Sequence, residues 1–268
     1  MRQGIAILKI LVTFALEPEF APWRRLRTFE EKKSPGGAIV FVSEISGAKI
    51  CVALTGMGRD NAAKTVYSFM LGELECPDFC ISAGLAGSLR PEYKPGQILA
   101  AHSVYAETVP ADFPGHEVRS DSSLLALAEK RGAAIVPRFC TTDHVVAKVK
   151  EKTSLSSLAA AVDMESWEVL RESGGWGVSA VAIRAVSDAA NESVPFDFTS
   201  LLDERGNPIT SKLAWAIARA PHKLPALIRL GFRSRRAASA LAAFLDSFVS
   251  ELAGQRPRRA RRAEAVRA

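Results

Sequence analysis

The sequence contains few of the residues from which metal sites and disulfide frameworks are built. Only four of its 268 residues are cysteine and four are histidine. Cys76 and Cys80 are separated by three residues, but neither a second pair nor a histidine lies nearby, so we expect no zinc site and no other metal. The cysteines lie in or beside apolar runs, which indicates buried thiols in a reducing compartment. We also expect no cofactor.

Long apolar stretches are missing as well. No run reaches the roughly 18 apolar residues that a membrane-spanning helix needs. Residues 5–16 are apolar, but Lys9 interrupts them, and no small-x-small cleavage site follows before the acidic Glu17 and Glu19. We therefore expect this stretch to be a buried strand rather than a signal peptide, and the protein to be cytoplasmic.

The fingerprints of nucleotide-binding loops are incomplete. The apolar run 48–54 leads into Gly56-Met57-Gly58, which lacks the third glycine of a dinucleotide-binding loop and the Lys-Ser/Thr pair of a P-loop. Alone, it is weak evidence for nucleotide or anion binding. Residues 83–88, Ala-Gly-Leu-Ala-Gly-Ser, are small enough for backbone amides to approach a ligand closely. A tight loop without a ligand explains them equally well.

Acidic residues are scarce only towards the C-terminus. The chain has 35 Lys/Arg and 29 Asp/Glu, a net charge of +6. Residues 212–268 contain 13 Lys/Arg and 3 Asp/Glu, which leaves 22 basic and 26 acidic residues, a net charge of −4, before them. This distribution is typical of a basic tail on an enzyme-like domain and argues against a nucleic-acid-binding protein.

What the sequence does contain is a series of apolar runs that alternate with helical stretches. At 48% hydrophobic and 24% charged residues, the composition is that of a globular protein, and the alternation predicts an α/β fold with a largely parallel sheet. We expect strands at residues 5–16, 38–43, 48–54, 78–82, 97–106, 134–140 and 178–186, with the second and third joined as a hairpin. We expect helices at residues 20–27, after the glycine turn to about residue 74, at 120–131 and at 235–252.

Acidic residues stand at the ends of two of these stretches. Asp163 and Glu165 open what looks like a helix, and Asp188 follows the run 178–186. Sheets of this kind bind ligands at such positions, and a carboxyl group there is costly to bury without a partner or a task. A helix N-terminal charge at Glu165 and a strand-end cap at Asp188 are the alternatives. His144 would by default be a loop residue with its own hydrogen-bond partner, and a place in a binding site is the alternative.

Five short segments follow one another in a recognisable order. They are Ala15-Leu16-Glu17-Pro18-Glu19, Thr55-Gly56-Met57-Gly58, Ser82-Ala83-Gly84-Leu85-Ala86-Gly87, Val162-Asp163-Met164-Glu165 and Arg184-Ala185-Val186-Ser187-Asp188. Together they resemble the purine nucleosidase/phosphorylase superfamily, in particular its methylthioadenosine/S-adenosylhomocysteine nucleosidase branch, over residues 5–198. The resemblance implies a three-layer α/β/α sandwich with a mixed, partly barrelled central sheet, and a homodimer. It places a catalytic domain at residues 1–200, a helical extension that completes it at 201–253, and a basic tail, expected to be disordered, at 254–268.

The resemblance also implies cleavage of a purine N-ribosidic bond through a transition state like an oxocarbenium ion. Asp188, beside Ser187, matches the acid that protonates N7 of the leaving base, a task that needs a proton-bearing carboxyl group at neutral pH. Glu165 matches the carboxylate that accepts hydrogen bonds from the ribose hydroxyls, and Glu19 matches the acid that activates water. The remaining positions that match substrate-binding residues are Met164 on the sugar, Val145 and Val146 on the base, and Met57, Gly84, Leu85 and Ala86.

Two positions depart from the family pattern. Leu85 replaces a small polar residue near the nucleophile, which bears on how the water is held. The phosphorylases carry an arginine just before the glycine-containing segment, but residues 77–82 contain no basic residue. Without such a clamp a phosphate dianion has little to hold it, so we favour hydrolysis. Arg59 is a weaker candidate for the same role.

The C-terminal part points to one branch of the superfamily. About 35 additional residues, 201–235, precede the final helix, and they resemble the hopanoid-biosynthesis branch, which removes adenine from adenosylhopane. A peripheral membrane contact through residues 212–236 would fit a helix with Trp215, Ile217, Leu224, Leu227 and Leu230 on one side, although Pro221 and Pro225 argue against one long helix. A domain cap or a dimer contact would explain the same residues. A soluble methylthioadenosine/S-adenosylhomocysteine nucleosidase, a phosphorylase and a non-catalytic nucleoside-binding module are the alternative functions.

Overall fold

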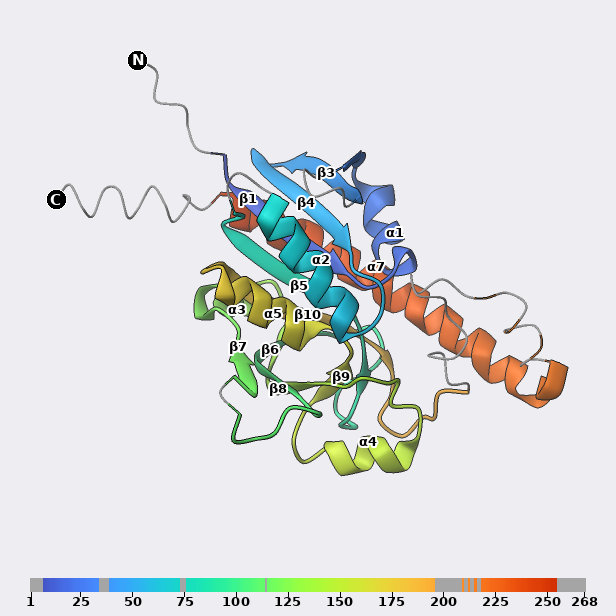
Figure 1. The fold of residues 1–268 in the computed structure, drawn as a ribbon. Helices are drawn as coiled ribbons and strands as arrows, with labels where there is room; N and C mark the ends of the chain where they lie inside the picture. The colour runs from blue at the N-terminus through green and yellow to red at the C-terminus, as the bar shows by residue number, and fades with distance from the viewer. Residues whose placement is uncertain are drawn as a thin grey trace, which may run out of the picture.

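A ten-stranded mixed sheet organises the fold (Figure 1). The computed structural model describes residues 7–33, 39–72, 76–113, 115–195, 209, 212, 215 and 218–254. The strands are β1 (Lys9–Phe14), β2 (Glu30–Lys33), β3 (Ile39–Ile45), β4 (Ala48–Leu54), β5 (Phe79–Ser88), β6 (Ile98–Ala106), β7 (Glu117–Arg119), β8 (Ala134–Thr141), β9 (Ala161–Asp163) and β10 (Ser179–Asp188). The helices are α1 (Glu17–Leu26), α2 (Arg59–Gly72), α3 (Ser122–Lys130), α4 (Val149–Leu155), α5 (Ser166–Gly175) and α7 (Leu224–Ala253), with a 3₁₀ turn η2 (Pro221–Lys223) before the last.

The sheet closes on itself at one end. Its strand order is β10-β6-β8-β9-β5-β1-β4-β3-β2, and β10 also pairs with β5, so β5, β9, β8, β6 and β10 form a five-stranded barrel. The β1–β4, β1–β5, β5–β10, β6–β8 and β8–β9 pairs are parallel, whereas β6–β10, β5–β9, β6–β7, β3–β4 and β2–β3 are antiparallel. The mixed, partly barrelled sheet is confirmed.

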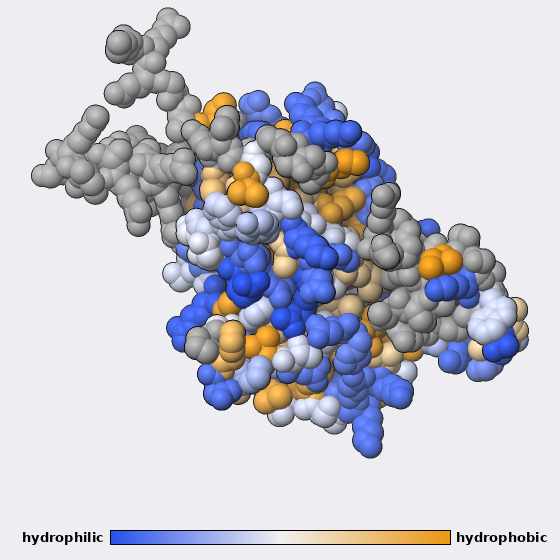
Figure 2. Space-filling view, viewed as in Figure 1, coloured by the Kyte–Doolittle hydropathy of each residue, from blue (hydrophilic) through white to orange (hydrophobic). Residues whose placement is uncertain are grey.

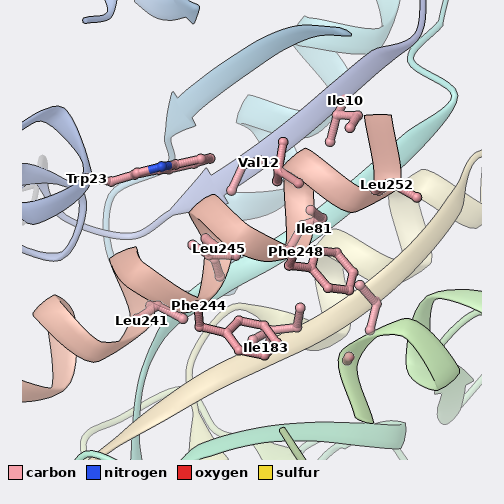
Figure 3. Close-up of a cluster of buried hydrophobic side chains, with 14 of the residues drawn as sticks. Ile10, Val12, Trp23, Ile81, Ile183, Leu241, Phe244, Leu245, Phe248 and Leu252 are labelled. Atoms are coloured by element: carbon pink, nitrogen blue, oxygen red, sulfur yellow. The ribbon is translucent and has the colours of Figure 1, made fainter. Parts of the chain in front are cut away.

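Helices cover both faces of the sheet, which makes three layers. Along β1, Ile10 and Val12 point into a core shared with α1, α3 and α7, while Leu11 between them points into a second core shared with α2 and α5. Figure 3 shows the first core, where Trp23 and Phe248 pack on the strands. Because alternate side chains of a strand face opposite sides, burial of both faces explains why these strands read as continuous apolar runs.

Most of the expected elements are confirmed, and two local predictions are wrong. β3 and β4 form the expected hairpin, and the side chain of Asp121 caps α3. Residues 83–88 are not a loop, because β5 continues to Ser88 through its pairing with β10 and β9. Asp163 does not begin a helix but ends β9, and α5 begins at Ser166. Ile5, at the start of the first expected strand, lies outside the described residues.

The C-terminal helix is longer than the sequence indicated. α7 is one helix of 30 residues that begins at Leu224. The expectation that Pro221 and Pro225 prevent one long helix over residues 212–236 is confirmed, because Ala220 is not helical and Pro221 lies in η2, while Pro225 lies in the first turn of α7, which needs no backbone N–H. Only its part from Ala237 onwards is buried, and its first turns project from the body (Figure 1). Residues 196–208 and 255–268, with most of 210–217, lie outside the described residues.

The projecting part of α7 has exposed apolar and basic residues. Its exposed apolar side chains are Leu224, Ile228 and Phe232, which are spaced four residues apart and so share one face. The expected stripe of Leu224, Leu227 and Leu230 is therefore wrong in part, since Leu227 and Leu230 are half-buried. In Figure 2 this part of the molecule carries hydrophobic patches among hydrophilic residues. In the described part of the chain, no helix has the length and apolar character needed to cross a bilayer.

Candidate active site

A cavity of about 170 Å³ lies where several strands end, and it brings together the residues that the sequence singled out. Glu19 comes just after β1, Met57 after β4 and the Val145–Val146 pair after β8. The residues expected at the site that line this cavity are Glu19, Met57, Leu85, Ala86, Val145, Val146, Met164, Glu165, Ser187 and Asp188. Gly84 is not among the lining residues, but a Cβ atom there would lie 3.5 Å from the Glu19 carboxylate oxygens. One cavity therefore collects acidic groups from distant parts of the chain.

Glu19 is fixed by backbone amides. Its Oε2 accepts hydrogen bonds from the N–H groups of Ala15 at 3.0 Å and Leu16 at 3.2 Å, and its Oε1 accepts one from Leu85 at 3.1 Å. Burial raises the pKa of Glu19, against these hydrogen bonds and the charge of Arg184. Leu85, the departure from the family pattern, thus contributes its backbone N–H to the orientation of this carboxyl group.

Glu165 is held by the glycine turn after β4. Its Oε1 accepts a hydrogen bond of 2.9 Å from the Gly58 N–H. Gly56 and Gly58 have φ of 76° and 90°, a region that glycine enters without strain, so the Gly-Met-Gly sequence suits this turn. Burial, followed by the nearby Asp163 charge, raises the pKa of Glu165 to about 8. Glu165 also stands at the N-cap position of α5, as the alternative interpretation of a helix N-terminal charge expects, but its side chain makes no capping hydrogen bond there and accepts from Gly58 instead.

Asp188 ends β10 and is held on both carboxylate oxygens. The Ser187 hydroxyl lies 2.6 Å from Oδ1, and the Lys152 ammonium group donates to Oδ2. A Cβ atom at Gly87 would lie 3.2 Å from Oδ2, so only glycine leaves room for this carboxyl group without a shift. Sequence reasoning missed Lys152, because the stretch Ala147-Lys148-Val149-Lys150-Glu151-Lys152 has the composition of an exposed helix.

A buried ion pair lies between the acidic residues. The Arg184 side chain is 2% exposed, its Nε lies 2.9 Å from Asp163 Oδ2, and its Nη1 donates to Ser82 O at 2.7 Å. Asp163 also accepts from Thr141 Oγ1 and from the first backbone N–H groups at α5. Arg184 belongs to the motif at residues 184–188, but the motif assigns it no role. A charged residue inside the apolar run 178–186 was the available signal, since a cation there needs a partner.

His144 lies at the cavity and also has a partner of its own. It lines the cavity, and its Nε2 contacts Glu151 Oε1. This contact raises the pKa of His144 above its usual value. The default interpretation of a loop histidine was therefore incomplete, because the residue belongs to the site as well.

The cavity is acidic, and Arg59 does not supply a positive charge to it. Its carboxyl-bearing lining residues are Glu19, Asp163, Glu165 and Asp188, and no Lys or Arg of the described chain lines it. The Arg59 guanidinium instead lies 3.0 Å from Glu168 Oε1 and stacks 4.8 Å above the Trp167 ring. An anion clamp at this cavity is therefore not seen among the described residues.

The mixed sheet with the barrel closed by β5 and β10, covered by helices, is the fold of nucleoside phosphorylases and nucleosidases. The family model of the phosphorylase superfamily matches residues 9–219. The chain belongs to the phosphorylase superfamily.

Relatives and solved structures agree with this assignment. The chain is 27% identical over 219 residues to the 5′-methylthioadenosine/S-adenosylhomocysteine nucleosidase of Shewanella halifaxensis, covering 75% of this chain and 94% of the relative. It is 28% identical over 221 residues to that of Shewanella pealeana, with the same coverage. The fold matches the corresponding enzyme of Helicobacter pylori with a TM-score of 0.71 at 24% identity, over 92% of this chain and 99% of that one. The futalosine hydrolase of Helicobacter pylori matches with a TM-score of 0.70 at 23% identity, over 91% and 98%.

Proposed function

We propose that this protein is a purine nucleosidase that hydrolyses the N-glycosidic bond of a 5′-substituted adenosine and releases adenine. The observation that supports this proposal most is the convergence of Glu19, Glu165 and Asp188 on one cavity. Relatives that match three quarters of the chain are named as nucleosidases for 5′-methylthioadenosine and S-adenosylhomocysteine.

In the proposed reaction the bond between C1′ and N9 breaks, and its electron pair leaves with the purine. Asp188 donates a proton to N7, so that the base departs as neutral adenine rather than as an anion. Burial gives Glu165 a pKa of about 8, and the hydrogen bonds that it would accept from the ribose hydroxyls favour its ionised form. That carboxylate would stabilise the positive charge that develops on the sugar. Glu19 takes a proton from the water that attacks C1′. General acid or base steps of this kind each contribute about 10²–10⁴-fold.

Several neighbours support these roles. Val145 and Val146 would contact the base and Met164 the sugar, while Met57, Leu85 and Ala86 would line the ribose side. Gly84 would contribute by leaving room for the Glu19 carboxyl group. Ser187 lies 2.6 Å from Asp188 Oδ1 and would fix the orientation of the acid.

Water is the proposed nucleophile rather than phosphate. Among the described residues, those that line the cavity carry four carboxyl groups and no guanidinium or ammonium group, so a phosphate dianion would find no cation to hold it there. The test is the release of adenine from 5′-methylthioadenosine with and without inorganic phosphate, with the sugar product identified. Free sugar formed at an unchanged rate would support hydrolysis, and a sugar 1-phosphate would refute it.

For the 5′ group we propose the hopane chain of adenosylhopane, which rests on the resemblance of residues 201–235 and on the apolar side chains that the start of α7 exposes. 5′-Methylthioadenosine and S-adenosylhomocysteine have at least equal support from the named relatives. Parallel adenine-release assays on adenosylhopane and on both soluble nucleosides would decide between them. A kcat/KM at least about 10-fold higher for a soluble nucleoside would refute the lipid substrate, because a tenfold preference corresponds to about 1.4 kcal/mol. Binding without release from any of them would indicate a non-catalytic module.

A lipid substrate would have to be reached at a membrane, and we propose that the start of α7 makes this contact. Leu224, Ile228 and Phe232 would enter the interface, and the exposed Arg229 and Arg236 would meet anionic lipid head groups. Flotation with anionic vesicles should recover the wild-type protein and lose Phe232→Ser, whereas Leu71→Ser, an equally exposed site on α2, should bind normally. Equal binding of both variants would refute the contact. Homodimerisation and a cytoplasmic location stay predictions, and sedimentation of the purified protein tests the first.

A further inference from the structure

The group behind Asp188 is a lysine with almost no access to solvent. The Lys152 side chain is 1% exposed, and its ammonium group donates to Asp188 Oδ2, to Ala189 O at 2.9 Å and to Glu192 O at 3.0 Å. Each of the three N–H groups of the ammonium group therefore donates one hydrogen bond. Lys152 comes from α4, whereas its three acceptors belong to the end of β10 and the segment after it.

This arrangement conflicts with a simple general acid. An ammonium group in hydrogen-bond contact favours the ionised form of a carboxyl group, and an ionised carboxylate has no proton to give. The pair as a whole, however, holds one proton. In a hydrogen-bonded buried pair this proton belongs to both groups, and excluding water brings the charged and neutral forms closer in free energy, since both ions lose hydration.

Other charged groups surround the pair on two sides. On one side the cavity is lined by Glu19, Asp163, Glu165 and His144. On the other, a second cavity of about 180 Å³ is lined by Asp188 together with Glu192, Arg229 and Arg233. Glu192 forms an ion pair with Arg233, so the positive charge of Arg233 offsets most of the negative charge of Glu192. Among the described residues, the contact with Lys152 is the only ion pair that Asp188 makes.

We propose that Lys152 is a positioning residue that supplies, through Asp188, the proton delivered to the leaving purine. This inference rests on the proposed nucleosidase function. As the C1′–N9 bond breaks, the Lys152 ammonium group passes its proton to the Asp188 carboxylate, and the carboxyl group formed in this way gives that proton to N7, so Asp188 ends again as a carboxylate. Adenine leaves neutral, Lys152 is left as an amine, and the proton lost by the attacking water stays on Glu19 until solvent exchange restores both groups.

The test compares two replacements of Lys152 over a range of pH. Arginine keeps the positive charge and cannot be deprotonated in a protein, so Lys152→Arg should keep Asp188 ionised and lower kcat for adenine release by about 10²–10⁴-fold at every pH. Lys152→Met leaves the buried Asp188 carboxyl group without a cation, and this carboxyl group would then keep its own proton at acidic pH. The kcat of that variant should stay within about 10-fold of the wild-type value near pH 5.5. It should fall as the pH rises, because an ionised carboxyl group can no longer act as a general acid.

A substrate with an activated leaving group separates proton delivery from structure. A 4-nitrophenyl riboside with the same 5′ group loses 4-nitrophenolate without protonation, so both variants should cleave it at rates near that of the wild type. If Lys152→Arg is instead the milder change, or if both variants lose both activities together, Lys152 only holds α4 to β10 and the proposal is wrong. A wild-type protein inactive on both substrates would overturn the proposed function itself.

Discussion

Burial of the Glu165 carboxyl group should lower the free energy of unfolding, and replacing the residue should reveal this loss. The carboxyl group ionises in an unfolded chain with a pKa of 4.5, and burial raises this pKa to about 8 in the folded protein. Between these values the folded state binds more protons than the unfolded state, so stability falls as the pH rises through this window and levels off above it. Because one pKa unit corresponds to about 1.4 kcal/mol, the loss is about 1 kcal/mol at about pH 5.5 and up to about 5 kcal/mol at about pH 9.

Glu165→Gln removes this titration and keeps an oxygen that can accept from the Gly58 N–H. We expect the variant to be more stable than the wild type, with the difference in free energy of unfolding growing by about 3 kcal/mol from about pH 5.5 to about pH 9. Urea unfolding at both pH values measures this difference directly. The same variant should lose most of its adenine release.

Glu168→Gln, in the first turn of α5 three residues after Glu165, provides a matched control. Glu168 is also buried, but its carboxylate is paired with Arg59 and Arg171, at 3.0 and 2.9 Å. Removing it should lower stability, since each of the two cations loses one carboxylate partner and keeps only a second, more exposed one, Asp143 for Arg59 and Glu172 for Arg171. Two results would refute the argument that burial raises the pKa of Glu165. One is a Glu165→Gln variant less stable than the wild type at the alkaline pH, and the other is a difference in free energy of unfolding that does not grow with pH.

Three other changes test the fold and the site. Gly87→Ala places a Cβ atom 3.2 Å from Asp188 Oδ2, so steady-state kinetics should show kcat reduced by about 10-fold or more with little change in KM, and an unchanged kcat would contradict the close fit. Arg184→Met leaves Asp163 buried without its cation and should lower the free energy of unfolding by about 3–5 kcal/mol; a loss below about 1 kcal/mol would mean that the pair contributes little. Phe248→Ala empties part of the core in Figure 3 and should cost about 3–5 kcal/mol in urea unfolding, whereas Leu71→Ala, at a 64% exposed side chain, should change stability by no more than about 0.5 kcal/mol. Equal effects of the last two would contradict the burial of Phe248.

The strands could be predicted from the sequence because burial on both faces leaves a simple pattern. The runs 48–54 and 178–186 became β4 and β10 almost at the expected boundaries. Closure of the barrel could not be predicted from the same pattern, because it depends on which strands pair. The extension of β5 through Gly84 and Gly87 is a consequence of that pairing, and its small residues look like a loop when taken alone.

The acidic residues of the site were found because the motifs supplied their order along the chain. Glu19 and Asp188 lie far apart in sequence, and only the fold brings their carboxyl groups to one cavity. Lys152 could not be found in this way, because its burial depends on how α4 packs against the segment after β10. Neighbouring lysines in an exposed-looking stretch have the same sequence context, so tertiary structure alone distinguishes them.

The start of α7 shows the limit of helical periodicity. The sequence predicted apolar residues on one side, but Leu227 and Leu230 are half-buried while Ile228 and Phe232 are exposed. Which face of an apolar helix is covered depends on the neighbouring segments, and these cannot be placed from the helix sequence alone.

The most direct test of the central claim is adenine release from 5′-methylthioadenosine in phosphate-free buffer by the wild-type protein and by Asp188→Asn. An acid that protonates the purine contributes about 10²-fold or more. The account predicts that the wild-type protein releases adenine and the free sugar, and that Asp188→Asn, although folded, releases adenine at least about 100-fold more slowly. Turnover by Asp188→Asn at the wild-type rate would contradict it.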